Sequence, residues 1–418
     1  MAVHEHVLRE EYQFDGRSRV PIRKLVLPGG EKVVTTVGDA IPKFREGDPQ
    51  SAFDYAFIRQ HAFPELPSFS RKVSVVDLFS GCGSLSLGAM EACRALGIGF
   101  ECIAAIDNDP EALQVFETNI PCRKTHPVDV NEILDGSLGQ PPTAREHSLM
   151  REIGEVNLLL AGPPCQGNSN LNNHTRRTDP RNILYEKAAR FVELFKPEHV
   201  LIENVPAVLR GREQSVQRSL ALIRSMRYAT DHWVVDLSTI GVPQRRKRHV
   251  LVASLRKKFS MRTIEDAHSV SNPRSVRWAI GDLEDEVPTG ILSSPSRHTK
   301  ENLRRIRYLH EKDLFDLPNR LRPLCHRNGG HSYGSMYGRI RLDEPAQTIT
   351  SGFLSPGQGR YVHPTRPRTI TPHEAARLQC FPDFFDFSRA RTRSSLARMI
   401  GNAAPMKLSY IVCLELLA

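Results

Sequence analysis

The stretch VSVVDLFSGCG, residues 73–83, decides the fold class of this 418-residue chain. It opens with a compact run of β-branched and apolar residues, which is typical of a parallel strand buried on both faces. The glycines that follow allow a tight turn and a close approach of the backbone to a ligand, and a helical pattern then reaches residue 96. A strand, a glycine-rich turn and a helix in this order indicate one unit of an α/β sheet.

Strand and helix patterns keep alternating beyond this unit. Apolar runs and turn signals predict five more strands and two helices: strands at 102–107, 156–161, 199–202, 233–237 and 249–253, and helices at 110–119 and 182–195. Alternation at this spacing is typical of βαβ units. We therefore predict an α/β fold with a doubly wound sheet.

The alternating pattern occupies residues 71–255, and its flanks differ from it. Residues 1–70 mix turn signals with short apolar pieces, which indicates an N-terminal extension, an appendage with a linker whose role the sequence does not give. Residues 256–367 are rich in Arg, His, Pro, Gly and Ser and predict a separate loop-rich domain. Helical patterns return in residues 368–418, which we expect to pack back on the sheet.

Composition and charge exclude several classes of protein. Lys and Arg total 57 against 47 Asp and Glu, a net charge of +10, and the 40% hydrophobic content is that of a globular domain rather than a disordered, collagen-like or coiled-coil chain. No apolar run approaches the ~18 residues of a membrane span, and the first residues are too polar for a signal peptide. We expect a cytoplasmic protein without membrane contact. The eight cysteines form no C-x-x-C pair, so we expect neither a disulfide scaffold nor a metal site.

Polar motifs follow three of the expected strands, at the sheet edge where ligands of open α/β sheets bind. At the first, the glycine-rich turn precedes Asp107, which ends the next strand where a carboxylate can accept hydrogen bonds from both hydroxyls of a ribose. Together they predict a nucleotide-like cofactor. No lysine follows the glycines, so a phosphate-binding P-loop is disfavoured.

The second motif, AGPPCQGNS at residues 161–169, places Cys165 just past a strand end. Two prolines stiffen the approach, and helix dipoles at such an edge favour the thiolate. A buried structural cysteine is the alternative, although burial would not require a rigid turn. The basic segment that follows is typical of a flap closing on phosphates, but a solvated loop has the same composition.

The third motif places Glu203 at the end of an apolar strand, where a low-dielectric cleft favours the protonated carboxyl and lets it donate a proton. A capping or ion-paired glutamate is the alternative. The segment GVPQRRKR, residues 241–248, precedes the last strand. In an extended segment Arg246 and Arg248 point to one face, where they could orient a base or a phosphate, whereas surface solubility is the simpler explanation.

With these motifs in this order, the sequence from residue 73 to the C-terminus resembles the DNA cytosine-5 methyltransferases of bacterial restriction–modification systems. The motifs that carry the resemblance are DLFSGCG at 77–83, Asp107 with Asn108, Asp129 with Val130, GPPCQ at 162–166, ENV at 203–205, QRRKR at 244–248, RLDEPAQTIT at 341–350, RTITPHEAARLQCFPD at 368–383 and GNAAP at 401–405. Ser84, Asn168 and Ala404 depart from the family pattern at positions where Gly, Phe and Val are usual.

The resemblance implies a Rossmann-like, S-adenosylmethionine-dependent methyltransferase domain with a mixed, doubly wound sheet, and a smaller loop-rich target recognition domain at 256–367. It implies catalytic roles for Cys165, Glu203, Arg246 and Arg248. The cofactor contacts that it implies are Phe79, Ser80, Gly81, Cys82, Gly83, Asp107, Asn108, Asp129, Val130, Gly162, Pro164 and Asn402. DNA contacts are expected from Gln166, Ser169, Arg176, Arg177, Arg181 and Gln244.

The activity that follows from the resemblance is methylation of carbon 5 of a flipped-out cytosine through a covalent adduct with Cys165. The partners would be double-stranded DNA, bound by a monomer, and a cognate restriction endonuclease. Three alternatives remain: an RNA cytosine-5 methyltransferase acting on transfer RNA, a catalytically silent DNA-binding regulator and a small-molecule methyltransferase. The long segment 256–367 favours DNA over transfer RNA. Cys165, Glu203 and Arg246 together speak against a silent protein, and a small-molecule enzyme would not need the recognition-like domain.

Overall fold

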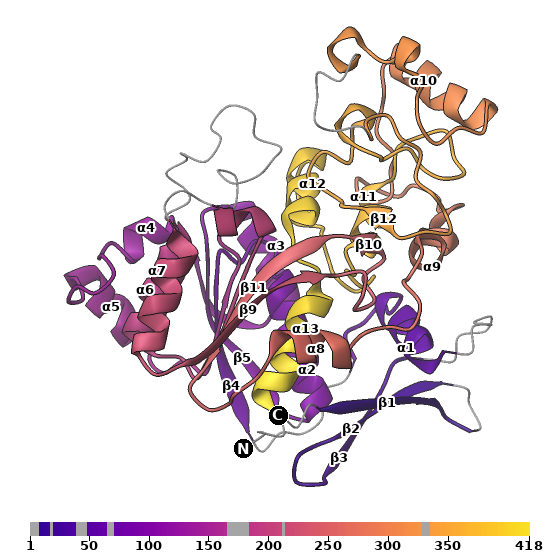
Figure 1. Ribbon diagram of the computed structural model, residues 1–418. Helices are drawn as coiled ribbons and strands as arrows, with labels where there is room; N and C mark the ends of the chain where they lie inside the picture. Colours follow the sequence, from indigo (N-terminus) through magenta and orange to yellow (C-terminus); the bar gives the residue numbers. More distant parts are fainter. Residues whose placement is uncertain are drawn as a thin grey trace.

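The computed structural model describes residues 8–16, 20–38, 48–64, 71–164, 184–210, 214–327 and 335–418. Its centre is a seven-stranded sheet in the order β6-β5-β4-β7-β8-β11-β9 (Figure 1). Neighbouring strands are parallel except at β11, which is antiparallel to both β8 and β9. The strands are β4 (Lys72–Leu78), β5 (Gly99–Asp107), β6 (Cys122–Pro127), β7 (Leu158–Ala161), β8 (His199–Asn204), β9 (Ala229–Asp236) and β11 (Lys247–Ser254).

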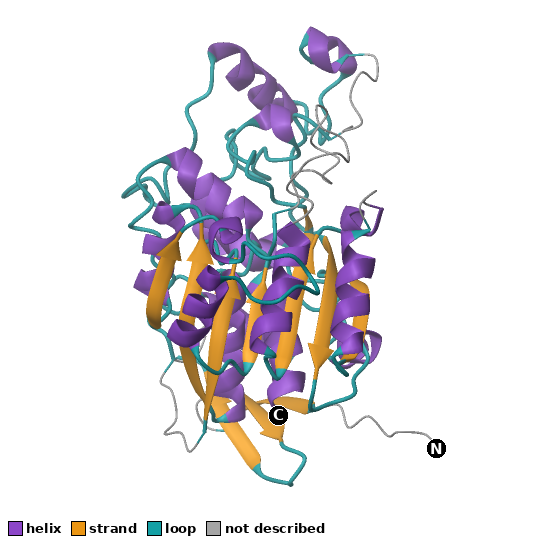
Figure 2. Ribbon diagram, turned by 90° about the vertical axis from the view of Figure 1, so that its left-hand side faces the viewer, coloured by secondary structure: helices purple, strands orange, loops and turns teal. Residues whose placement is uncertain are grey.

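Helices cover both faces of this sheet (Figure 2). One face packs on α2 (Ser84–Leu96), α3 (Pro110–Asn119) and α13 (Met406–Leu417) in the main core. The other face packs on α4 (Val130–Ile133), α5 (Ala144–Ile153), α6 (Leu184–Phe195) and α7 (Ser215–Ser225). Strand order reverses between β4 and β7, so the predicted doubly wound, mixed sheet is confirmed.

Local sequence explains most element boundaries. Asp109 accepts hydrogen bonds from the first backbone N–H groups of α3, and Pro110 opens that helix, which has the predicted bounds. Reciprocal capping boxes start α5, at Thr143 and Glu146, and α11 (Pro372–Leu378), at Thr371 and Glu374. β6 was not predicted, because this edge strand is polar and half exposed and carries no apolar run.

The N-terminal residues are not the appendage that the sequence suggested. β1 (Arg9–Phe14), β2 (Pro21–Val26) and β3 (Lys32–Thr36) form an antiparallel sheet, followed by α1 (Pro49–Ile58). Leu25 of β2 and Phe53 of α1 belong to the main core, together with residues of α2 and α13. Arg23 is buried and bonds both Glu91 on α2 and Tyr410 on α13. This region is therefore part of the main body.

A second, smaller core lies above the sheet in Figure 1. Its buried members are Ile306, Leu309, Leu317, Tyr337 and Val362. The elements around it include α10 (Lys300–Glu311) and the short 3-10 turns η4 (Asn319–Leu321), η5 (Leu324–His326) and η6 (Pro356–Gln358). By contrast, α8 (Met261–Ala267), α9 (Val276–Ile280) and η3 (Gly281–Leu283) supply residues to the main core. The second core thus begins later in the chain than residue 256.

Two further elements complete the description. The short strands β10 (Gln244–Arg245) and β12 (Ala346–Gln347) pair in parallel beside the main sheet. Helix α12 (Arg393–Asn402) precedes α13, which packs closely on α2. Gly88 permits that approach, since a Cβ there would stand 2.1 Å from the backbone oxygen of Met406. Through α13, residues 368–418 therefore contribute to the main core.

Candidate active site

The glycine-rich turn lies at the carboxyl end of β4, next to the point where the strand order reverses. Phe79, Gly81 and Gly83 all have positive φ, and Gly83 opens α2. A Cβ at Gly83 would lie 2.9 Å from the Phe116 ring, whereas no atom of the described residues lies within 4 Å of the Cβ position at Gly81. Glycine is thus required at 83 by packing, and at 81 it leaves open space beside the backbone.

Asp107 organises this turn. One carboxylate oxygen accepts a 2.8 Å hydrogen bond from the Gly81 N–H, and the other accepts one of 2.8 Å from the Asp109 N–H. Burial raises the pKa of Asp107, although these backbone donors oppose the shift. The carboxylate that was predicted to bind a ribose therefore also ties the loop after β4 to the loop after β5.

The other predicted cofactor residues lie on loops along the same edge. Asn108 is exposed directly after β5, Asp129 caps α4 after β6, and Val130 is buried behind it. Gly162 and Pro164 follow β7, where the Gly162 N–H donates to the Leu78 oxygen. The Cys82 thiol lies in the core, and burial raises its pKa to about 12. The remaining two are Ser80, whose hydroxyl is buried without a partner among the described residues, and Asn402, exposed at the end of α12.

Ser84, one of the departures from the family pattern, has a structural role. Its hydroxyl donates a 2.5 Å hydrogen bond to the backbone oxygen of Ala404, which is another of the three departures. This contact joins the start of α2 to the junction between α12 and α13. The predicted cofactor motifs at 77–83 and 401–405 therefore lie next to each other.

Asp77, buried at the end of β4, gives a prediction for pH dependence. Burial raises its pKa to about 7, against a hydrogen bond of 2.6 Å from the Ser86 hydroxyl. When the pKa of an acid is higher in the folded than in the unfolded state, its contribution to stability is lost as the pH rises from the unfolded-state pKa to the folded-state pKa, here about 7. The unfolding free energy of Asp77→Asn, measured relative to that of wild type, should therefore rise by about 2–3 kcal/mol from pH 5 to pH 8. Urea unfolding at both pH values measures this, and a constant difference would contradict it.

Glu203 and Arg248 meet at the carboxyl end of β8. Nε of Arg248 lies 2.6 Å from Oε1 of Glu203, although the two atoms are not aligned as a hydrogen bond. The Arg248 side chain is 12% exposed and that of Glu203 is 10% exposed, so the guanidinium compensates a largely buried carboxylate. This pairing is the alternative that the sequence left open for Glu203. It also follows from register, because Val250 faces Glu203 and Arg248 is two residues away on the same side of β11.

The loop that carries Cys165 leaves the sheet next to Glu203. Ala161 of β7 pairs with Ile202 of β8, and the Asn204 side chain donates a 3.1 Å hydrogen bond to the Pro163 oxygen. Pro164 is the last residue described before a gap. The predicted residues Cys165, Gln166, Ser169, Arg176, Arg177 and Arg181 lie outside the described residues.

Arg246 and Gln244 are not placed as predicted. The buried Arg246 guanidinium donates to the backbone oxygens of Ile349, Gly401 and Ala403, whereas Arg248 pairs with Glu203. Gln244 is fully buried and bonds Gln379 and the backbone of Leu378 and Ile349. Both residues join the β10 segment to α11, α12 and the recognition-domain signature.

The sequence analysis missed two residues beside Glu203. Asn204, whose position next to Glu203 in the ENV motif was the available signal, holds the Pro163 turn. Tyr185 on α6 has a buried hydroxyl without a partner among the described residues. Burial, and then the negative charge of Glu203, raise the pKa of Tyr185. Its apolar surroundings in the sequence gave no such signal.

Metal ligands and membrane-spanning helices were considered for the part of the chain that the structure describes. No group of three or more His, Cys, Asp or Glu side chains there could hold a metal ion. Within the same residues, every helix is too short or too polar to cross a bilayer.

Comparison with known proteins identifies the family. A profile of the C-5 cytosine-specific DNA methylase family matches residues 73–417. Type II methyltransferase M1.BsuMI of Bacillus subtilis (strain 168) is 42% identical over 407 residues, which cover 97% of this chain and 94% of the relative. Type II methylase M.HgiDII of Herpetosiphon aurantiacus is 32% identical over 349 residues, covering 81% and 93%.

Solved structures agree with this assignment. A prophage-encoded E. coli protein described as a candidate DNA modification methyltransferase has a TM-score of 0.58 and 25% identity, with coverage of 82% of this chain and 98% of that one. S. pombe Dnmt2 methyltransferase shares the fold, with a TM-score of 0.58, 18% identity and coverage of 83% and 99%.

The fold and the edge of the sheet thus define a Rossmann-like methyltransferase. The chain belongs to the C-5 cytosine-specific DNA methylase family and is a DNA cytosine-5 methyltransferase.

Proposed function

We propose that this enzyme transfers a methyl group from S-adenosylmethionine to carbon 5 of a flipped-out cytosine in duplex DNA, as the modification half of a restriction–modification pair. The observation that carries the proposal is the Glu203–Arg248 pair, which lies one strand away from the Gly-Pro-Pro turn that leads to Cys165. The similarity to Type II methyltransferases supports a role beside a cognate restriction endonuclease. The enzyme would act on DNA as a monomer.

Chemistry at carbon 5 needs an activated ring, because this carbon is a poor nucleophile in cytosine. The Cys165 thiolate forms a bond to carbon 6, which divides one difficult step into easier ones. Glu203 contacts N3 and the exocyclic amine and, when protonated, stabilises the charge that develops on the ring. Arg248 holds the Glu203 carboxyl in place. Loss of the carbon 5 proton after methylation lets the thiolate leave.

A cysteine cannot reach carbon 6 inside a duplex, so the target base must leave the helix. Extrusion costs on the order of a few kcal/mol of stacking and pairing. The basic segment with Arg176, Arg177 and Arg181 is the proposed flap that closes on the DNA backbone. Gln166 and Ser169 would lie close to the extruded base.

The residues beside β4 fit S-adenosylmethionine, which supplies an electrophilic methyl group when bound. Phe79 would contact the adenine, and Asp107 the ribose. The space at Gly81 offers a close backbone approach, and the buried Ser80 hydroxyl, which has no partner among the described residues, offers a polar contact. Further predicted contacts are Asn108 after β5, Asp129 at the start of α4 and Asn402 at the end of α12.

Asp107→Ala should weaken S-adenosylmethionine binding by about 10- to 100-fold while duplex binding changes less than about twofold. The variant loses the ribose acceptor and also the two backbone bonds that shape the loop. Isothermal titration gives the cofactor Kd, and fluorescence anisotropy gives the DNA Kd. Glu101→Ala, at the opposite end of β5, is the matched control. A larger loss for DNA than for cofactor would contradict this placement.

The proposed function is tested by methyl transfer from labelled S-adenosylmethionine to duplex DNA, with transfer RNA as competitor. We expect label in the duplex and no competition by transfer RNA. Bisulfite sequencing of DNA from cells that express the enzyme should then show protected cytosines within one short sequence. Label in transfer RNA but not in duplex DNA would overturn the proposal.

A further inference from the structure

Helix α1 lies outside the region matched by the family profile, yet it packs where the main core meets the second domain. The Trp278 indole of α9 donates a 3.1 Å hydrogen bond to Ser51, and its ring meets Tyr55 edge-on with centroids 5.9 Å apart. Arg274, just before α9, pairs with Asp48 at 3.0 Å. These contacts join α1 to α9, which with η3 ends the stretch of main-core elements before the chain turns toward the second domain.

Arg59 ends α1 and makes the densest contacts of this junction. Its guanidinium pairs with both carboxylate oxygens of Asp282, at 3.1 and 2.5 Å, and donates to the backbone oxygens of Trp278 and Ala279. The group also stacks 3.4 Å above the Tyr55 ring. A guanidinium held in this way fixes both the position and the direction of its partner.

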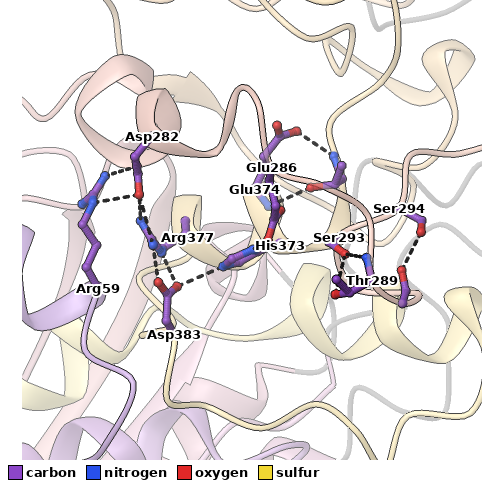
Figure 3. Close-up of polar contacts among 12 residues, drawn as sticks. Arg59, Asp282, Glu286, Thr289, Ser293, Ser294, His373, Glu374, Arg377 and Asp383 are labelled. Carbon is purple, nitrogen blue, oxygen red and sulfur yellow. Dashed lines mark hydrogen bonds and ion pairs between the residues drawn. The ribbon is translucent and has the colours of Figure 1, made fainter.

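Charges of alternating sign continue from Asp282 across α11 (Figure 3). Arg377 contacts Asp282 at 3.4 Å and pairs closely with Asp383. His373 bridges Asp383 at 2.9 Å and Glu286 at 2.7 Å. Burial by itself would lower the pKa of His373, but its two carboxylate partners outweigh this and raise the pKa to about 9, so the imidazole is a cation at neutral pH.

We call this series of six residues the hinge clamp: Arg59, Asp282, Arg377, Asp383, His373 and Glu286. Its last member lies on the segment 284–299, which leads from the main core to α10. The same end of α11 also holds the segment that leads back from Val362. There Arg368 forms a two-bond pair with Glu374, at 2.6 and 2.7 Å.

Apolar packing does not fill the space between these two connecting segments. A cavity of about 320 Å³ lies there, and residues of both segments line it, among them Glu284, Pro288, Arg366 and Arg368. Ion pairs hold the segments instead: Arg366 pairs directly with Glu284 and Asp285 across them, and α11 holds one segment through Glu286 and the other through Arg368. Arg377 and Asp383 are 2% and 8% exposed, which makes the middle of the hinge clamp rigid and weakly screened.

We propose that the hinge clamp fixes the angle at which the recognition domain stands over the catalytic sheet, and that Arg59 makes α1 a positioning element for DNA. The proposal rests on the proposed function, because the recognition domain and the sheet must hold one duplex between them. The N-terminal region would then act on DNA binding indirectly, by holding the recognition domain in position. Consistent with this, 97% of the 418 residues align with M1.BsuMI, which leaves about 13 unaligned, so that relative shares part of this region.

Arg59→Ala and Glu286→Gln test the proposal at the two ends of the hinge clamp. Both should raise KM for duplex DNA, by about tenfold, with kcat and the cofactor Kd within about twofold of wild type. A simple charge effect on DNA would act in opposite directions, since one variant loses a positive charge and the other a negative one. Arg59→Lys should restore part of the loss, and Arg123→Ala, which breaks an exposed ion pair elsewhere, should have no effect.

The double variant adds a second criterion. If both ends act through one series of contacts, its KM should be no higher than that of the worse single variant, whereas independent effects would multiply. Unchanged KM in both single variants, opposite shifts, or multiplying effects would each overturn the proposal. If Arg59→Ala does not fold, Glu286→Gln decides alone. A wild-type enzyme that methylates no duplex would instead count against the proposed function.

Discussion

Cys165→Ala will abolish methyl transfer to DNA while leaving S-adenosylmethionine binding intact. Without the sulfur, carbon 5 stays a weak nucleophile, since no other described side chain at this edge can add to carbon 6. We expect kcat to fall by at least about 10³-fold, to the limit of a labelled-methyl assay. Isothermal titration should show a cofactor Kd within about twofold of wild type, because Cys165 is not among the predicted cofactor contacts.

Cys122→Ala is the matched control for the loss of a thiol. Cys122 lies on the edge strand β6, where its sulfur contacts Cys102 rather than the proposed site. It should keep full activity. Full activity in Cys165→Ala would end the assignment of the nucleophile, and loss of cofactor binding in that variant would show that the residue serves the cofactor instead.

Glu203→Gln should lower kcat by about 10²- to 10⁴-fold with only a small change in DNA affinity. The amide keeps the size of the side chain, but it can neither exchange a proton with the ring nor balance the Arg248 guanidinium. Single-turnover methylation at saturating DNA and cofactor isolates this step from binding.

Arg248→Ala and Arg246→Ala separate two roles that the sequence joined. Arg248→Ala should also lower kcat, because it leaves the Glu203 carboxylate largely buried and unpaired. Arg246→Ala should mainly lower the melting temperature, since three backbone oxygens lose their donor. An unchanged kcat in Glu203→Gln, or a purely catalytic defect in Arg246→Ala, would contradict the geometry described here.

The sheet could be predicted from the sequence because its central strands are buried on both faces. LLLA in β7 and HVLIEN in β8 are fully buried, and such runs are distinctive. Edge strand β6, with the sequence CRKTHP, could not be predicted, because it is half exposed and its pairing with β5 is set by neighbours rather than by composition.

The predicted site residues could be placed from the sequence where they lie at the end of a strand. Glu203 and Arg248 were expected at this edge, although their direct pairing was not. Arg246 was assigned to the face of Arg248 by strand alternation, but β10 ends at Arg245 and β11 begins at Lys247, so Arg246 stands at a junction where alternation restarts. Alternation is a reliable guide only within one continuous strand.

Long-range packing of the N-terminal region could not be predicted from its local patterns. Its turn signals mark real breaks between short strands, but nothing in them shows that Leu25 joins the main core or that Arg23 bonds residues 91 and 410. Arg59 likewise reads as an ordinary surface residue, and only its contacts with Asp282 reveal the hinge clamp.

The central claim is a covalent bond between the Cys165 sulfur and carbon 6 of an extruded cytosine. The most direct measurement uses a duplex that carries 5-fluorocytosine at the methylated position, with S-adenosylmethionine present. Fluorine cannot leave as a proton does, so the adduct should persist through denaturation, and mass spectrometry of the digest should place it on the peptide that contains Cys165. An active enzyme that forms no adduct, or forms it through another side chain, would contradict the account.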